Sequence, residues 1–149
     1  MSSSYVRTEI KTFLSANSTE NVVDLTGQYL QLNEMLTAEG LTRNDPWLGI
    51  QFIGSTETPQ SLVSTNNQGR YREIGSLFFH VVARVSNTLR DDILARAETL
   101  RNSIRGRRIN DIVIEGVTPP NFEQGATLDL EGGYSSASVI VNYYRDLNL

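Results

Sequence analysis

The sequence has no cysteine, a single lysine and a single histidine among its 149 residues. The absence of cysteine excludes disulfides and thiol chemistry, and a structural zinc site would have to be built from His80 and carboxylates alone. No run of about 18 apolar residues is present, and the first residues lack the basic-then-apolar layout of a signal peptide. We therefore expect a soluble intracellular protein that has no metal, no cofactor and no membrane contact.

Positive charge is also scarce, with 13 Lys and Arg against 17 Asp and Glu and a formal net charge of -4. Sequence-independent binding to DNA requires neutralisation of its phosphates, so this balance argues against a general nucleic-acid binder. The same charge balance is compatible with a conduit through which DNA passes without binding. Apart from Lys11 the cations are arginines, which prefer planar bidentate partners. Arginine-rich subunit interfaces and codon bias explain this preference equally well.

Apolar residues at helical spacing predict three helices. The first covers 4–14, and the second lies within 28–41 with Gly40 as its stop. The third, 88–105, has Asp91 and Asp92 in its first turn and arginines near its end, as the helix dipole favours, and Gly106 supplies a left-handed stop. Its apolar face consists of Leu89, Ile93, Ala97, Leu100 and Ile104. A helix with such a face must cover a sheet.

Alternating patterns predict strands at 47–53, 71–85, 109–117 and 134–144, and the brief β-branched stretch 21–25 is expected to be a short strand or an extended arm. The long pattern at 71–85 is expected in the middle of the sheet. The core-facing residues of the longer strands should be Leu48, Ile50, Phe52, Leu77, Phe79, Val81, Ala83, Val85, Ala137, Val139, Val141 and Tyr143. The opposite side of the last strand, with Ser136 and Ser138, is expected to be wetter.

Two polar stretches, 54–68 and 118–133, separate these strands. Gly132 and Gly133 are expected to form the turn before the last strand. Ordered loops longer than about 12–15 residues are usually functional or disordered. We therefore interpret both stretches as interaction arms of a one-domain protein that spans residues 1–149.

The residues that could support catalysis have simpler structural explanations. His80 lies between apolar neighbours on its strand face, which favours a structural role over acid–base chemistry. Asp91 and Asp92 diverge by about 100° on a helix, so they form a poor metal pair. No strand, glycine-rich turn and helix follow one another as a phosphate site requires. The sequence predicts no catalytic residue.

The strongest local positive charge is the group Arg105, Arg107 and Arg108. One interpretation is contact with an acidic neighbouring subunit or with the phosphates of passing DNA. The other is charge that complements a helix end. If subunits meet here, bidentate pairs with Glu115, Asp129 or Glu131 of a neighbour are the expected contacts.

Four stretches of the chain carry a family resemblance. They are Asp45 to Phe52 (DPWLGIQF), Tyr71 to Glu73 before the long strand, Arg105 to Asn110 (RGRRIN) and Val117 to Phe122 (VTPPNF). In this order they resemble the tail terminator proteins of siphophages, the long-tailed bacteriophages. The resemblance covers most of the chain and is weakest at 17–43. None of the four stretches is a catalytic motif.

The resemblance implies a hexameric ring at the tail–neck junction of a virion, assembled in the host cytoplasm. Such a ring would bind the last ring of tail tube protein, stop tube polymerisation and present its other face to the head–tail connector or stopper protein. Genomic DNA would pass through the lumen without specific binding. The predicted contact residues with neighbouring subunits or the tube are Arg70, Tyr71, Arg105, Arg107, Arg108, Glu115, Asp129 and Glu131.

The elements and the resemblance together predict an α+β fold, a single mixed and mainly antiparallel sheet with helices packed on one face and extended hairpin or loop arms. Two other functions remain open. A neck adaptor or stopper of the head–tail connector would share the size, the sheet and the ring. A small hydrolase or nuclease would need convergent carboxylates or a working His80.

Overall fold

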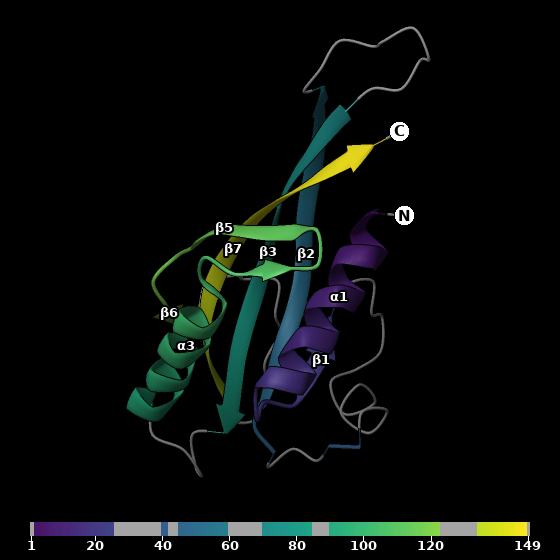
Figure 1. The fold of residues 1–149 in the computed structure, drawn as a ribbon. Coiled ribbons are helices and arrows are strands. Elements are labelled where there is room, and N and C mark those ends of the chain that lie inside the picture. The colour runs from purple at the N-terminus through teal and green to yellow at the C-terminus, as the bar shows by residue number, and fades with distance from the viewer. Residues whose placement is uncertain are drawn as a thin grey trace, which may run out of the picture.

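A curled sheet of seven strands carries two helices on one of its faces (Figure 1). The computed structural model describes residues 2–25, 40–41, 45–59, 70–84, 90–122 and 134–148, and the structural statements below concern these residues. One mixed sheet with helices on one face confirms the predicted α+β fold. Nearly all of the helix expected within 28–41 lies outside the described residues, as do Val85 and Leu89.

The strands are β1 (Val22–Asp24), β2 (Trp47–Pro59), β3 (Arg70–Arg84), β4 (Arg108–Ile109), β5 (Ile112–Val117), β6 (Asn121–Phe122) and β7 (Tyr134–Asn148). Their order in the sheet is β1-β2-β3-β7-β5-β4, and β6 pairs with β7 outside this path. β1 and β2 pair in parallel, and the other pairs are antiparallel. β3 lies between β2 and β7, which confirms the expectation that the longest apolar pattern belongs in the middle of the sheet.

The helices α1 (Ser2–Asn17) and α3 (Arg90–Ile104) pack on the same face of the sheet, called the inner face below. Their buried residues are Val6, Ile10 and Leu14 of α1 and Ile93, Ala97, Leu100 and Ile104 of α3. These side chains pack in one core with Leu48, Leu77 and Val141 of the sheet. Each large apolar side chain that leaves water here contributes about 1.5–3 kcal/mol. Neither of the described helices is long and apolar enough to cross a bilayer.

The inner face contains nearly all of the predicted core. Leu48, Ile50 and the described core residues of β3 and β7 are buried, whereas Phe52 is half-buried. Along each strand the alternate residues point to the opposite side, called the outer face. There Trp47, Val82 and Val23 form a second, smaller cluster. Ser136 and Ser138 are buried as well, so the outer side of β7 is not wet at this end, contrary to the expectation.

Three strands continue past the packed core and form an arm (Figure 1). We define the arm as Gly54–Pro59 of β2, residues 70–76 of β3 and residues 142–148 of β7. The first six residues of the polar stretch 54–68 are therefore strand, and β7 continues past the predicted end at Tyr144. Serine and threonine at these positions pair with β3 although no apolar alternation indicates a strand. Residues 60–69 lie outside the described part of the chain.

Two other predictions need correction. Residues 109–117 do not form one strand, because Asn110 and Asp111 turn the chain between β4 and β5, with Asn110 at a φ of 53°. Asparagine tolerates this left-handed conformation better than most residues, so it permits a two-residue turn. The predicted loop 118–133 contains the short strand β6. Residues 123–133, including Gly132 and Gly133, lie outside the described part.

Candidate subunit interface

Three exposed arginines, Arg105, Arg107 and Arg108, form a basic corner where α3 ends and β4 begins. Gly106 has a φ of 71°, which ends the helix and turns the chain toward β4. Arg107 Nε donates to the carbonyl of Ser103 at 2.8 Å, and Arg108 Nε donates to the carbonyl of Asn110 at 3.0 Å. Within the described ranges none of the three arginines takes part in an ion pair. Their remaining N–H groups can therefore donate hydrogen bonds to a carboxylate of another molecule.

The outer face of the arm exposes apolar side chains between paired polar groups. Ile74 is 44% exposed, and Ile53, which directly precedes the arm on β2, is 50% exposed. Arg72 binds Asp146 through two hydrogen bonds of 2.8 and 3.2 Å, and its guanidinium lies 4.1 Å from the ring centre of Tyr144. Apolar side chains bordered by polar pairs are typical of surfaces that meet another protein.

A buried polar cluster lies on the inner face at the base of the arm. Tyr143 donates its hydroxyl to Glu73 Oε2 at 2.9 Å, and both residues are fully buried. Burial and this hydrogen bond raise the pKa of Tyr143, which keeps its phenol protonated as a donor. Arg145 Nε lies 3.6 Å from the same Glu73 oxygen. Among the described residues Glu73 Oε1 has no hydrogen-bond partner, so the charge of this carboxylate depends on Arg145 for compensation.

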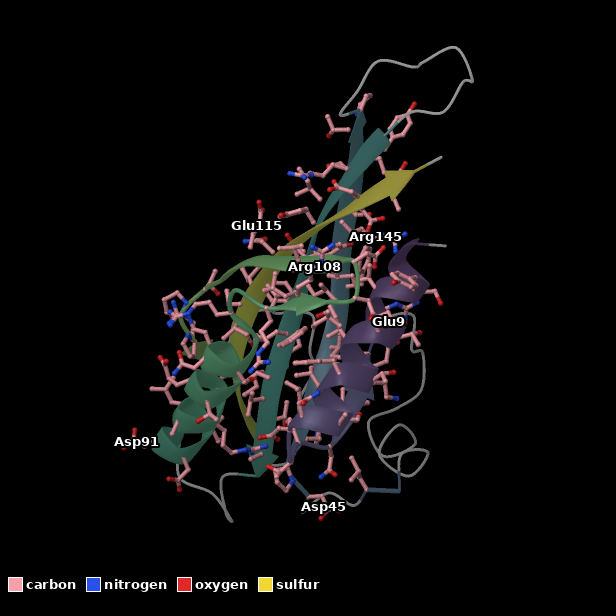
Figure 2. All side chains as sticks on the ribbon, viewed as in Figure 1. Glu9, Asp45, Asp91, Arg108, Glu115 and Arg145 are labelled. Atoms are coloured by element: carbon pink, nitrogen blue, oxygen red, sulfur yellow. The ribbon has the colours of Figure 1, made fainter. Side chains whose placement is uncertain are left out.

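The same arginine reaches the first helix. Arg145 Nη1 lies 3.8 Å from Asp111 Oδ2 in the β4–β5 turn, and its guanidinium lies 4.4 Å from the ring centre of Tyr5 in α1. Tyr5 donates its hydroxyl to Asp111 Oδ1 at 2.6 Å, and this bond raises the pKa of Tyr5. Figure 2 shows Arg145 where α1, the β4–β5 turn and the arm converge. The cluster therefore ties the arm to the helical side of the molecule.

His80 lies in a separate buried polar group on the outer face. Its Nδ1 is 2.7 Å from Ser138 Oγ, its Nε2 is 3.0 Å from Gln51 Oε1, and its ring stacks on Phe78. Because the Gln51 oxygen accepts, Nε2 carries the proton and Nδ1 accepts from Ser138. Burial lowers the pKa of His80 to about 4. A neutral imidazole between a serine and an amide has no carboxylate to orient it, so the group resembles a satisfied core histidine more than a catalytic site.

His80 should make stability depend on pH. The unfolded chain has an ordinary histidine pKa of about 6.5, so between this value and the native value of about 4 the unfolded chain binds a proton that the native protein does not. Stability therefore falls as the pH drops through this window. Between pH 7 and pH 5 the residue should remove about 2 kcal/mol from the free energy of unfolding. Urea unfolding of the wild type and of His80→Gln at both pH values measures this loss of unfolding free energy, which should be larger in the wild type. An equal loss in both proteins would contradict the assignment.

The predicted contact residues do not all come together. Arg105, Arg107 and Arg108 come together in the basic corner, whereas Tyr71 is half-buried on the arm, opposite Pro59 and Leu147 in the sheet register. Arg70 begins β3 at the far end of the arm. Glu115 is exposed at the bulge in β5 (Figure 2) and contributes to raising the pKa of Arg72, after the larger effect of the Asp146 hydrogen bond. Asp129 and Glu131 lie outside the described residues.

Sequence reasoning missed the polar cluster around Glu73 and Arg145. A signal was available, because Glu73 is in step with Leu77 on β3 and Arg145 is in step with Val141 on β7. Charged residues at core-facing positions indicate a buried pair. The exposed Ile74 was missed for the opposite reason, since an apolar residue in a strand is normally taken as core.

No family model matches the chain, and no curated protein matches it. Within the described part of the chain no group of three His, Asp or Glu side chains is placed to hold a metal ion. The features that bear on function are therefore the basic corner, the arm and the sequence stretches quoted above.

Proposed function

We propose that this chain is the subunit of a closed ring that caps the tail tube of a siphophage, stops its polymerisation and forms the tail side of the head-joining interface. The quoted sequence stretches suggest the family. The observation that carries the proposal in the structure is the arm, a three-stranded extension beyond the helices in which residues 55–59 are exposed on both faces of the sheet. The exposed end of this extension, beyond the buried Glu73 and Tyr143, adds little to the core of a monomer.

The basic corner supports the same proposal. A ring closes by head-to-tail contacts, in which one surface of each subunit meets a different surface of the next. Exposed arginines without an ion pair in the described chain suit one of these two surfaces, because guanidinium groups bind carboxylates of the facing subunit in a planar bidentate geometry. The net charge of -4 is compatible with a lumen through which DNA moves without strong binding.

The mass of the purified protein, alone and mixed with tail tube protein, tests this function. Native mass spectrometry should show a closed six-subunit species, either in the free protein or when tube protein is present. A strict monomer that ignores tube protein would contradict the proposal. A ring that binds a connector protein but not tube protein would instead identify a neck adaptor or stopper.

Replacing Arg107 and Arg108 by alanine should weaken ring assembly or tube capping, since the replacement removes two of the three exposed guanidinium groups of the basic corner. The matched control replaces both by lysine, which keeps the charge and loses the planar bidentate geometry. If bidentate pairing is the contact, both variants should assemble less well than the wild type, and the alanine variant least. Unchanged oligomer mass and unchanged tail joining in the alanine variant would remove these residues from the interface.

A further inference from the structure

The arm has one sheet edge on each side, and neither edge has a partner strand within the described chain. Among the described residues β1 pairs only with residues 48–50 of β2, so the one described strand beside Gly54–Pro59 is β3. On the other side of the arm, β5 pairs with β7 as far as Arg145, so the one described strand beside 146–148 is also β3. Each edge presents backbone donors and acceptors that another strand can satisfy.

The β2 edge has few of the charged side chains that keep strand edges from pairing. Native edges are commonly protected by lysines and other charges, by proline or by β-bulges. Gly54–Pro59 has no lysine, one charge at Glu57 and a proline at its last position, and its side chains from Ser55 onward are all exposed. A bulge between Phe52 and Gly54 immediately precedes the edge and leaves Ile53 exposed on the outer face. We read this edge as one that a partner strand covers.

The direction of the strands indicates which partner fits. β2 and β7 are both antiparallel to β3, so they run in the same direction along the arm. Rotation about a ring axis that runs along the arms keeps the direction of every strand. In such a ring the β2 edge of one copy meets the β7 edge of the next in parallel, and the same contact repeats until the ring closes.

We infer that Gly54–Pro59 of one subunit pairs in parallel with residues 146–148 of β7 in a second copy of this chain. The inference rests on the proposed ring and names the surface by which its subunits join. The neighbouring strand would also place side chains beside the exposed outer face of the arm. Continuous pairing around the ring removes both free edges, as closure does in a β-barrel.

Cysteine cross-linking tests the contact cleanly because the chain has no cysteine of its own. Thr58 and Asp146 both pair with Arg72, one on each side. They are therefore two strand spacings, or about 10 Å, apart in one subunit, beyond the roughly 7 Å reach of a disulfide. In the double variant Thr58→Cys/Asp146→Cys a disulfide between these positions must join two chains. A second double variant, Thr56→Cys/Asp146→Cys, would detect the same contact if the register between the two copies differed by two residues.

Oxidation of the double variant, alone and with tube protein, should give a ladder of covalent oligomers that ends at the ring mass. The single variants Thr58→Cys and Asp146→Cys are the matched controls, and neither should form more than a trace of dimer. The Asp146→Cys variant also controls for loss of the exposed Arg72–Asp146 ion pair, which contributes little to stability. Efficient dimerisation of Thr58→Cys alone would mean that two β2 edges meet symmetrically, and it would overturn the inference.

The other outcomes separate this contact from the proposed function. A ring seen by native mass spectrometry without cross-linking of either double variant would overturn the edge contact and leave the ring function standing. A ladder of open oligomers that never binds tube protein would support the contact and contradict tube capping. Protection of Thr58→Cys from alkylation by tube protein, without cross-linking between copies, would assign the edge to the tube protein and overturn the inference.

A second variant tests the edge without cysteine. Thr56→Lys/Thr58→Lys adds the protective residues that the edge lacks, and we expect it to shift the native mass from ring to monomer. The control places the same two charges on exposed positions of α3, as Ala95→Lys/Thr99→Lys. Circular dichroism and urea unfolding establish that both variants fold. An edge variant that folds and still forms the ring as the control does would overturn the proposed contact.

Discussion

Replacing Arg145 by methionine is expected to lower the free energy of unfolding by on the order of 3–5 kcal/mol, the range for breaking a buried ion pair by removal of one partner. Glu73 is fully buried, and its contacts in the described chain are the Tyr143 hydroxyl and the Arg145 guanidinium. Without Arg145 the carboxylate is left charged in the protein interior or must take up a proton. Urea unfolding at pH 7 measures the loss.

The control for this prediction is the double variant Glu73→Gln/Arg145→Met. It removes the buried negative charge together with its partner, so it should be more stable than Arg145→Met alone. Arg7 provides a contrasting single variant, because its pair with Asp24 is partly exposed and Arg7→Met should cost much less. If Arg145→Met and Arg7→Met cost the same, the Glu73 cluster has no special role in stability.

Replacing Gly75 by alanine is expected to cost about 3 kcal/mol, near the upper end of the usual range for an overpacked core. A Cβ on Gly75 would lie 2.5 Å from the hydroxyl oxygen of Tyr143 and 2.6 Å from two of its ring carbons. The tyrosine cannot move aside easily because its hydroxyl is bound to buried Glu73. Urea or thermal unfolding of Gly75→Ala measures the effect.

Gly54 is the matched control, since it lies on the neighbouring strand and a Cβ there would meet nothing within 4 Å. Gly54→Ala should therefore change stability by no more than about 0.5 kcal/mol. In the background Tyr143→Leu, which removes the ring, the cost of Gly75→Ala should shrink. An unchanged cost in that background would place the strain elsewhere than at the tyrosine.

The two predictions concern the same place, the base of the arm on the inner face. If the arm joins neighbouring subunits, the Glu73 cluster sets its direction relative to α1, because Arg145 contacts both the arm and Tyr5. Weakening the cluster would then lower ring assembly as well as stability. This second effect depends on the proposed function, whereas the stability effects do not.

Local patterns predicted the parts of the fold in which apolar spacing is regular. The residues Ile93, Ala97, Leu100 and Ile104 lie on one buried face of α3, as their spacing indicates. The alternation at Leu77, Phe79 and Val81 correctly placed β3 in the middle of the sheet. The Asn110–Asp111 turn was missed although its residues are common in tight turns, because the apolar residues on both sides extended the apparent strand.

The class of the fold, the core-facing residues and the basic corner follow from the periodicity of side chains within single segments and from residues adjacent in the chain. The strand pairing of the arm and the meeting of Glu73 with Arg145 follow from tertiary structure. Polar residues such as Thr56 and Thr58 form a strand because β3 offers a partner, and Glu73 meets Arg145 because β3 pairs with β7 in one particular register. Contacts between distant segments depend on strand pairing, which no local pattern of residues encodes.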